Sequence, residues 1–314
     1  MTPSNSKTDS DIKLIVLDID GTLLNSKLEL SERNELTLKA AMAEGAQVVL
    51  ATGKTRNAGI KLVERLGLTT PGIYLQGLVI YEADGTISYQ QTLEPAVARQ
   101  VLTFGHDRGF KFIAYSGTRM MIARHDADII DGMTRYHEPA PEVVGPLVNL
   151  VDRLPLNKLM AIGEPRAIKA LRWQLEAQLG GAARLMQAGI PTMLEILPPG
   201  ASKGAALRHL LHSLHIDKAQ VMAMGDAEND TEMLQLAGIG VAIGNADAPL
   251  KKIADHVAPT NDEDGVADSV ERFVLKRKLG VLASADAEKM IEPGGEPPIE
   301  PQSANAAVES EEQR

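Results

Sequence analysis

The sequence predicts an α/β protein in which a doubly wound, Rossmann-like parallel sheet is interrupted by an inserted α+β domain. In residues 12–91 and 196–275, short and wholly apolar runs alternate with helical patterns, and most of these runs end in polar residues. Buried parallel strands have this pattern. In residues 92–195 the order of strands and helices changes, which indicates a separate α+β layer.

The composition is that of an ordinary globular protein, with 314 residues, 44% of them hydrophobic and 24% charged. No run approaches the roughly 18 apolar residues of a membrane span, and the first ten residues lack the apolar block of a secretory signal. We therefore expect a cytoplasmic protein with no membrane partner. The absence of cysteine excludes disulfides and thiolate sites, and the net charge of -10 argues against nucleic acid.

The two ends of the chain differ from the rest. Residues 280–314 hold eight Asp or Glu and only two Lys or Arg, with Pro-Gly-Gly and Pro-Pro steps between them. Such a segment has too little apolar surface to offset the entropy of ordering. We expect residues 1–11 and this acidic tail to be disordered.

The first predicted strand, residues 14–17, leads directly into a pair of carboxylates. Side chains alternate along a strand, so Asp18 and Asp20 share one face while Ile19 points back. Two like charges at this range require a cation or a shared proton, and oxygen ligands favour Mg²⁺. A simple Asp-Gly turn is the alternative, but it leaves Asp18 unexplained.

The second strand ends in a pattern typical of phosphate binding. Residues 46–51 are apolar and are followed by Thr52-Gly53-Lys54-Thr55 and then a helical pattern. A hydroxyl, a flexible glycine and fresh helix N–H groups can together cradle a phosphate. The remaining elements expected before residue 92 are a helix over 29–44 with Ser31 as N-cap and Gly45 as its stop, a helix over 56–66, a strand over 72–75, and a hairpin of 78–81 and 86–89 that turns at Asp84-Gly85.

The inserted region is predicted to alternate short strands and helices. We expect Trp173 to lie in its core, and five residues after or within its strands are candidate substrate contacts: Tyr115, Ser116, Arg119, Arg124 and His125. The expected elements are helices over 94–108 and 165–179 and strands over 111–115, 119–123, 157–162, 183–186 and 192–196.

Two further motifs follow the insertion. Lys203 opens the helix predicted over 205–214, where a cation opposes the helix dipole unless an anion lies nearby; a solvated surface lysine is the alternative. His209, His212 and His215 on that helix have no acidic or cysteine partner, so we expect an exposed face. The strand predicted over 221–224 ends in an acidic cluster, before a helix over 231–237 and a strand over 240–243: Asp226, Glu228, Asn229 and Asp230.

Together these motifs resemble the haloacid dehalogenase (HAD) superfamily of phosphatases, and over residues 12–275 the chain is similar to its Cof-type members. The matching patterns are Asp-x-Asp-Gly-Thr at 18–22 and Gly-Asp-x-x-Asn-Asp at 225–230, with Thr52 and Lys203 between them. Lys54 stands where these relatives usually have Arg, and Gln76-Gly77 where they commonly have Asn-Gly. The resemblance implies a HAD-like core, residues 12–91 and 196–275, with residues 92–195 as a cap.

The resemblance also implies a mechanism and a set of roles. Phosphatase activity on a small phosphorylated metabolite, a sugar phosphate or a phosphorylated cofactor precursor, would proceed through an aspartyl-phosphate with Mg²⁺ as cofactor. A phosphotransferase or phosphomutase, and a non-catalytic protein that binds a phosphometabolite, remain open alternatives. The implied roles are Asp18 as nucleophile and Asp20 as acid and base. Asp18, Asp20 and Asp226 would lie at the metal, and Asp230 would orient these ligands without binding the ion itself. The residues implied around the phosphoryl group are Ile19, Thr52, Gly53, Lys203 and Asn229.

Overall fold

The computed structural model describes residues 11–187, 190–277 and 279. All but the last lie in one compact unit, Met1–Lys278, and the second unit is Leu279–Arg314. The predictions of disorder for residues 1–10 and 280–314 fall outside the described residues. Within the described residues, no helix has both the length and the apolar character needed to cross a membrane.

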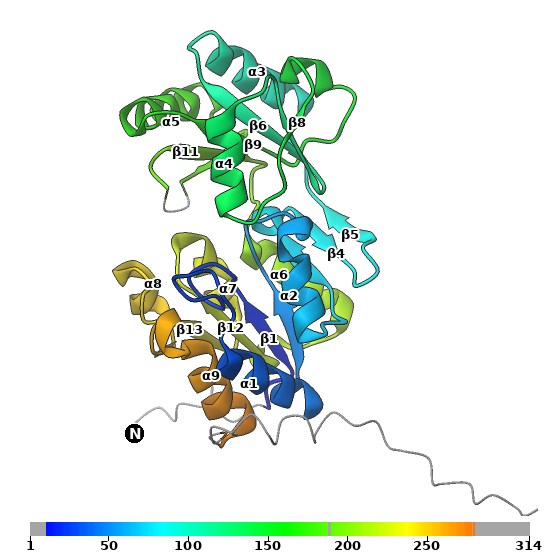
Figure 1. Cartoon of the computed structure of the whole chain (residues 1–314), viewed down its shortest axis with the longest axis vertical. Helices are drawn as coiled ribbons and strands as arrows, with labels where there is room; N and C mark the ends of the chain where they lie inside the picture. The colour runs from blue at the N-terminus through cyan, green and yellow to red at the C-terminus, as the bar shows by residue number, and fades with distance from the viewer. Residues whose placement is uncertain (1–10, 188–189, 278, 280–314) are drawn as a thin grey trace, which may run out of the picture. The chain divides into compact units, whose positions relative to one another are not determined.

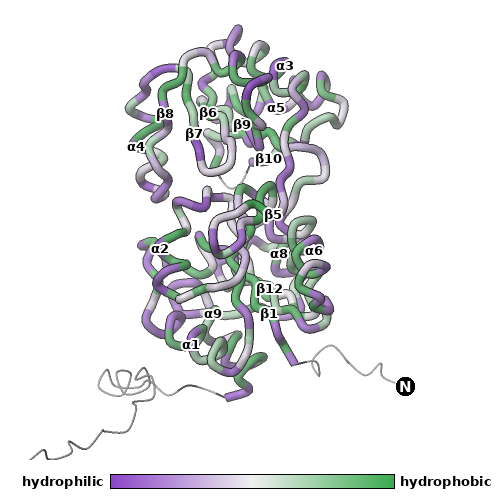
Figure 2. The backbone as a smooth tube through the Cα atoms, turned by 90° about the vertical axis from the view of Figure 1, so that its right-hand side faces the viewer, coloured by the Kyte–Doolittle hydropathy of each residue, from purple (hydrophilic) through white to green (hydrophobic). Residues whose placement is uncertain are grey.

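The expected parallel sheet is present at the centre of the fold. Five strands lie in the order β14-β13-β12-β1-β2, and every neighbouring pair is parallel. All four residues of β1 are fully buried, and the tube in Figure 2 is hydrophobic along β1 and β12. The strands are β1 (Leu14–Leu17), β2 (Gln47–Leu50), β12 (Val221–Gly225), β13 (Ile239–Ala242) and β14 (His256–Val257).

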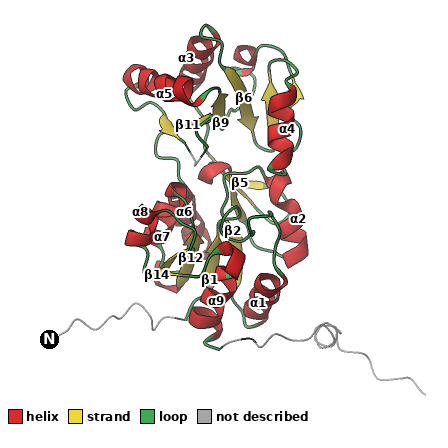
Figure 3. Ribbon diagram, turned by 60° about the vertical axis from the view of Figure 1, so that its left-hand side comes forward, coloured by secondary structure: helices red, strands yellow, loops and turns green. Residues whose placement is uncertain are grey.

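Helices cover both faces of this sheet, as the doubly wound prediction requires (Figures 1 and 3). The face that carries Leu14 and Val16 packs against α6 and α7, while α1 and α9 contact each other on the opposite side. Ser31 is the N-cap of α1, as predicted. The helices of this part are α1 (Glu32–Ala43), α2 (Arg56–Leu66), α6 (Lys203–Leu214), α7 (Thr231–Leu236), α8 (Ala248–Ile253) and α9 (Gly265–Val270).

A small antiparallel sheet, β3-β4-β5, follows α2. It consists of β3 (Gly72–Tyr74), β4 (Val79–Tyr81) and β5 (Ile87–Gln90). The predicted hairpin turn is confirmed, because Gly85 has φ 89° and the Asp84 carboxylate accepts from the backbone N–H of Thr86. The strand over 72–75 ends one residue early, at Tyr74, where a short 3₁₀ turn begins at Leu75.

The inserted region, residues 92–195, which was expected to be a cap and is called the cap below, forms a six-stranded sheet in the order β10-β11-β9-β6-β7-β8, antiparallel except for the β7–β8 pair. Its helices α3 and α5 cover one face, where Val101 and Leu171 share one buried hydrophobic cluster with Leu159 of the sheet. The elements are α3 (Pro95–His106), β6 (Lys111–Ser116), β7 (Arg119–Ile122), α4 (Ala127–Arg135), β8 (Glu142–Val143), β9 (Lys158–Ile162), α5 (Pro165–Leu179), β10 (Arg184–Met186) and β11 (Met193–Leu197).

The prediction that Trp173 lies in the core is wrong, because its side chain is 72% exposed. The buried stripe of α5 repeats every three to four residues, as one face of a helix must. A residue two positions after Leu171 therefore faces solvent. The stripe consists of Ile168, Leu171, Leu175 and Leu179.

Several short elements were not predicted. Helix α4 has a regular N-cap at Asp126, whose side chain accepts from the N–H of Ile129. Only two of its nine residues, Ile129 and Met133, are buried; they are four positions apart and therefore lie on one face of a short helix. Helices α8 and α9 have six residues each, and strands β8 and β14 have two.

Candidate active site

The site lies at the carboxyl ends of the parallel strands, where open α/β sheets bind ligands. Asp18 follows β1 directly, and its N–H bonds to the carbonyl of Met224 in β12. Asp18 is 6% exposed. Gly21 then turns the chain with φ 79°, a conformation that costs glycine little.

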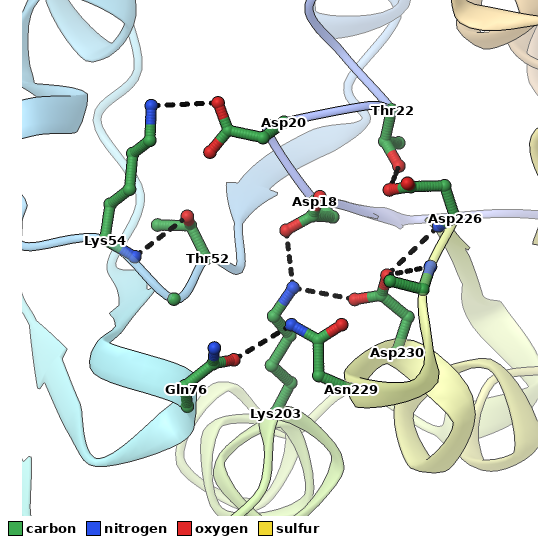
Figure 4. A network of polar contacts seen from close by, with 12 residues as sticks. Asp18, Asp20, Thr22, Thr52, Lys54, Gln76, Lys203, Asp226, Asn229 and Asp230 are labelled. Carbon is green, nitrogen blue, oxygen red and sulfur yellow. Dashed lines mark hydrogen bonds and ion pairs between the residues drawn. The ribbon is translucent and has the colours of Figure 1, made fainter. Parts of the chain in front are cut away.

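Lys203 joins two of the acidic motifs. Its Nζ lies 2.5 Å from Asp18 Oδ1 and 2.7 Å from Asp230 Oδ1 (Figure 4). Ser202 is the N-cap of α6 and accepts from the N–H of Ala205, so Lys203 occupies the first helical position. The two carboxylates supply the anions that a lysine at this end of a helix requires, and the side chain is completely buried.

Asp230 also shapes the loop that carries Asp226. Its Oδ2 accepts from the N–H groups of Asp226 and Ala227 at 3.0 and 3.1 Å. Thr22 donates its hydroxyl to Asp226 Oδ1 at 2.9 Å. The first and fourth motifs are therefore tied together across the strand pair β1–β12.

Burial and mutual repulsion perturb the titration of this cluster. Burial raises the pKa of Asp18 well above its usual value, although the charge of Lys203 opposes this. Burial, followed by the charge of Asp230, raises the pKa of Asp226 to about 6. Burial lowers the pKa of Lys203, but the charges of Asp18 and Asp230 outweigh it and the net shift is upward. The site thus concentrates negative charge that one lysine does not balance.

These residues fit a divalent cation. Asp18, Asp226 and Asp230 each offer a carboxylate oxygen, and these atoms lie within 4.8 Å of one another. An oxygen-only donor set suits a hard ion. A Cβ on Gly21 would lie 2.4 Å from Asp226 Oδ2, so only glycine lets the turn approach this carboxylate.

The second motif lies on the other side of Asp18. Thr52 is 1% exposed, and its Oγ1 accepts from the N–H of Lys54 at 3.1 Å. The Lys54 Nζ lies 2.8 Å from Asp20 Oδ1, so the lysine that replaces the usual arginine contacts the second carboxylate of the first motif. Asp20 is the more open of the two acids, with a side chain 35% exposed.

Asn229, predicted to reach the phosphoryl group, bonds to a residue that sequence reasoning noted only as a departure from the family pattern. Its Nδ2 donates to Gln76 Oε1 at 2.9 Å (Figure 4). Gln76 in turn donates through Nε2 to Glu195 Oε2 of the cap, at 3.0 Å. The network of the site therefore continues into β11.

A cavity of about 360 Å³ opens from the two carboxylates toward the cap. Of the five candidate substrate contacts, only Tyr115 lines it. Arg119 instead pairs with the exposed Glu142 on β8, and Ser116, Arg124 and His125 are not in the cavity wall. The cap side of the wall consists of Tyr115, Met133, Tyr136, Glu138, Lys158, Met160, Ile190, Met193 and Glu195.

Sequence reasoning missed the charged pair in this wall. Lys158 and Glu195 form an ion pair and are 1% and 4% exposed. They share one face of the cap sheet with Met160 and Met193, because side chains alternate along β9 and β11. A single charge within an otherwise apolar strand is the signal that could have found them, since such a charge must be paired when buried.

Comparison with known proteins identifies the family. Residues 15–270 match the family model for a haloacid dehalogenase-like hydrolase. Phosphatase YwpJ of Bacillus subtilis is 30% identical over 84% of this chain and 100% of its own length. The chloroplastic endoribonuclease YBEY of Arabidopsis thaliana is 36% identical over 83% of this chain, but the match spans only 46% of that protein, so its named activity is not transferred.

The fold is also found in solved structures. A haloacid dehalogenase-like hydrolase from Bacteroides thetaiotaomicron superposes with a TM-score of 0.77 and is 30% identical, over 83% of this chain and 99% of its own. The family match, the complete first and fourth motifs and the shared fold agree. The chain belongs to the haloacid dehalogenase-like hydrolases.

Proposed function

We propose that this chain is a magnesium-dependent phosphatase that hydrolyses a small phosphorylated metabolite through an aspartyl-phosphate on Asp18. The observation that carries the proposal is the position of Lys203, which bridges Asp18 and Asp230 while Asp226 completes an acidic cluster. A phosphate monoester dianion needs neutralisation, an in-line nucleophile and a proton for its leaving oxygen. This site offers a group for each requirement.

Asp18 is the nucleophile in this proposal. Its carboxylate oxygen attacks phosphorus, the bond to the leaving oxygen breaks, and an acyl phosphate forms that water can hydrolyse. Lys203 holds Oδ1 of this carboxylate, which leaves the other oxygen for attack. Burial favours the reaction because it removes the water that would otherwise solvate the nucleophile.

Asp20 is the acid and then the base. Asp20 lines the same cavity as Asp18 but is more exposed, so it can reach both the leaving group and an incoming water. It donates a proton to the leaving oxygen in the first step and removes one from water in the second. Lys54 contacts this carboxylate and orients it.

Asp18, Asp226 and the backbone carbonyl of the Ile19–Asp20 segment would hold Mg²⁺, with Asp230 orienting Asp226 through its backbone N–H. When bound, the ion neutralises charge that develops on the phosphoryl oxygens. Thr52, Gly53, Lys203 and Asn229 provide the remaining hydrogen bonds.

The cap selects the leaving group. We infer that residues 92–195 close the cavity over the site carried by residues 12–91 and 196–275. The cavity volume of about 360 Å³ suits a small metabolite and is too small for a macromolecule. A sugar phosphate and a phosphorylated cofactor precursor both fit this size.

Phosphate release by the purified full chain tests the proposal. A panel of sugar phosphates, phosphorylated cofactor precursors and an aryl phosphate is assayed colorimetrically, with Mg²⁺ or with excess chelator. We expect release that chelation abolishes and Mg²⁺ restores, and loss of turnover in Asp18→Asn. Full activity in chelator, or an Asp18→Asn variant as active as wild type, would contradict the proposal. An isomerised sugar phosphate without free phosphate would identify a phosphomutase instead.

A further inference from the structure

A chain of hydrogen bonds runs from the cap to the phosphoryl site through one glutamine. Glu195 Oε2 accepts from Gln76 Nε2 at 3.0 Å, and Gln76 Oε1 accepts from Asn229 Nδ2 at 2.9 Å. Gln76 and Glu195 are 5% and 4% exposed. Water therefore competes little for these bonds, and the donors and acceptors must satisfy one another.

The cap fixes which group donates and which accepts in these hydrogen bonds. Lys158 donates to Glu195 Oε1, so the partner of Gln76 is a carboxylate, which only accepts. Gln76 must turn its Nε2 toward Glu195 and its Oε1 toward Asn229. Asn229 must then turn its Nδ2 toward Gln76, and its buried Oδ1 has no hydrogen-bond partner among the described residues. One cap charge thus orients two amides.

Gln76 also contacts the loop of the second motif. Its backbone N–H bonds to the carbonyl of Thr52 at 3.0 Å, and a Cβ on Gly53 would lie 2.5 Å from its Nε2. Lys158 reaches the same loop by donating to the carbonyl of Gly53 at 3.2 Å. The two segments proposed to hold the phosphoryl oxygens, the Thr52–Gly53 loop and Asn229, therefore meet at this side chain.

The backbone of Gln76 is held in an unfavourable conformation. Its φ of 63° and ψ of 27° lie in the left-handed region, which asparagine tolerates better than most residues that have a side chain. Such strain persists only where the surroundings hold the residue in place, and it occurs often at functional sites. The longer side chain of glutamine at this position reaches both Glu195 and Asn229.

We propose that Gln76 is a positioning residue that links the cap, through Glu195, to the alignment of Asn229 and the Thr52–Gly53 loop. The inference rests on the proposed function, because it assigns a task within that site. Its consequence is specific. Loss of Glu195 slows the transfer of every phosphoryl group, whatever leaving group carries it, because the effect reaches Asn229 through Gln76 and reaches the Thr52–Gly53 loop through Gln76 and Lys158.

A pair of reciprocal substitutions tests the link. Gln76→Glu sets two buried carboxylates against each other, and we expect kcat/KM to fall by roughly tenfold or more. Adding Glu195→Gln restores a donor facing an acceptor, because an amide at 195 can donate to a carboxylate at 76, which still accepts from Asn229. We expect the double variant to regain most of the loss. A double variant no more active than Gln76→Glu would overturn the proposal.

A comparison of substrates separates this role from direct contact with substrate, since Glu195 also lines the cavity. Glu195→Gln is assayed on acetyl phosphate, whose leaving group is too small to reach the cap, and on p-nitrophenyl phosphate. We expect kcat to fall by the same factor for both. A loss confined to the larger substrate would make Glu195 a substrate contact and would overturn the link.

Side-chain amide NMR tests the link without catalysis. In the ¹⁵N-labelled full chain, we expect Glu195→Gln to change the chemical shifts of the Asn229 side-chain NH₂ group, because Gln76 is hydrogen-bonded to both residue 195 and Asn229. The control is Glu164→Gln, an exposed cap residue whose side chain makes no capping bond. Unmoved Asn229 signals would refute the link, even if Gln76→Glu failed to fold. If wild type releases no phosphate, the proposed function fails while this measurement still decides the link.

Discussion

Replacing Asp226 by asparagine should stabilise the metal-free protein, although it removes a residue of the proposed metal site. The pKa of Asp226 is raised to about 6 from a usual value of 3.8, mainly by burial and then by the charge of Asp230. The folded state therefore keeps a proton that the unfolded state releases between these two values. The contribution of Asp226 to the free energy of unfolding is therefore most favourable below pH 3.8. That contribution is lost as the pH rises through 6.

The size of the effect follows from the same two values. A rise from 3.8 to about 6 corresponds to about 3 kcal/mol of unfavourable free energy once both states are ionised. The asparagine of the variant stays neutral at every pH and keeps an oxygen to accept from Thr22. In chelator at about pH 7.5, we expect Asp226→Asn to unfold at a higher denaturant concentration than wild type, by up to about 3 kcal/mol.

The assay is chemical unfolding at pH 7.5 and pH 4, with and without Mg²⁺. At pH 4 the difference between the proteins should largely vanish, because Asp226 of the folded wild type is then protonated. Added Mg²⁺ at pH 7.5 should stabilise wild type by binding the folded state and should stabilise Asp226→Asn much less. A variant less stable than wild type in chelator at pH 7.5 would refute this electrostatic reasoning.

Three other substitutions follow from the geometry. Asp20→Asn should lower kcat by about 10² to 10⁴ because it removes the acid and base, and rapid turnover by the variant would contradict that role. Lys203→Met leaves two buried carboxylates without their cation, so the free energy of unfolding should fall by about 3 to 5 kcal/mol. The matched control is Lys61→Met, at an exposed lysine. Equal melting curves for the Lys203→Met and Lys61→Met variants would argue against the buried network. Thr52→Val preserves shape and removes the hydroxyl, and we expect kcat to fall by roughly a hundredfold to a thousandfold, whereas an unchanged kcat would exclude Thr52 from the phosphoryl site.

Much of the site could be predicted because strand geometry fixes it. Apolar runs such as residues 14–17 identify buried strands, and the polar residues that follow them must meet at one edge of a parallel sheet. This brings Asp18 and Asp226 together from 208 positions apart. The unusual position of Lys203, at the start of a helix, likewise required anions nearby, and Asp18 and Asp230 supply them.

The cap contacts could not be predicted because they depend on which face of the cap sheet meets the core. Arg119 belongs to a strand near the sheet edge and pairs with Glu142 across it, whereas Tyr115 points into the cavity. The bond between Gln76 and Glu195 joins residues 119 positions apart, and no local pattern specifies it. Trp173 is different, since the spacing of Leu171 and Leu175 already places it on the exposed face of α5.

The central claim, that a phosphoryl group is carried on Asp18, can be tested by stopping turnover with acid and analysing the peptide that contains Asp18 by mass spectrometry. In Asp20→Asn, where release is slowed more than attack on a good leaving group, we expect that peptide to gain the mass of one phosphoryl group and to lose it on treatment with hydroxylamine. Phosphate release at a measurable rate, with the Asp18 peptide unmodified at every time point, would contradict the account.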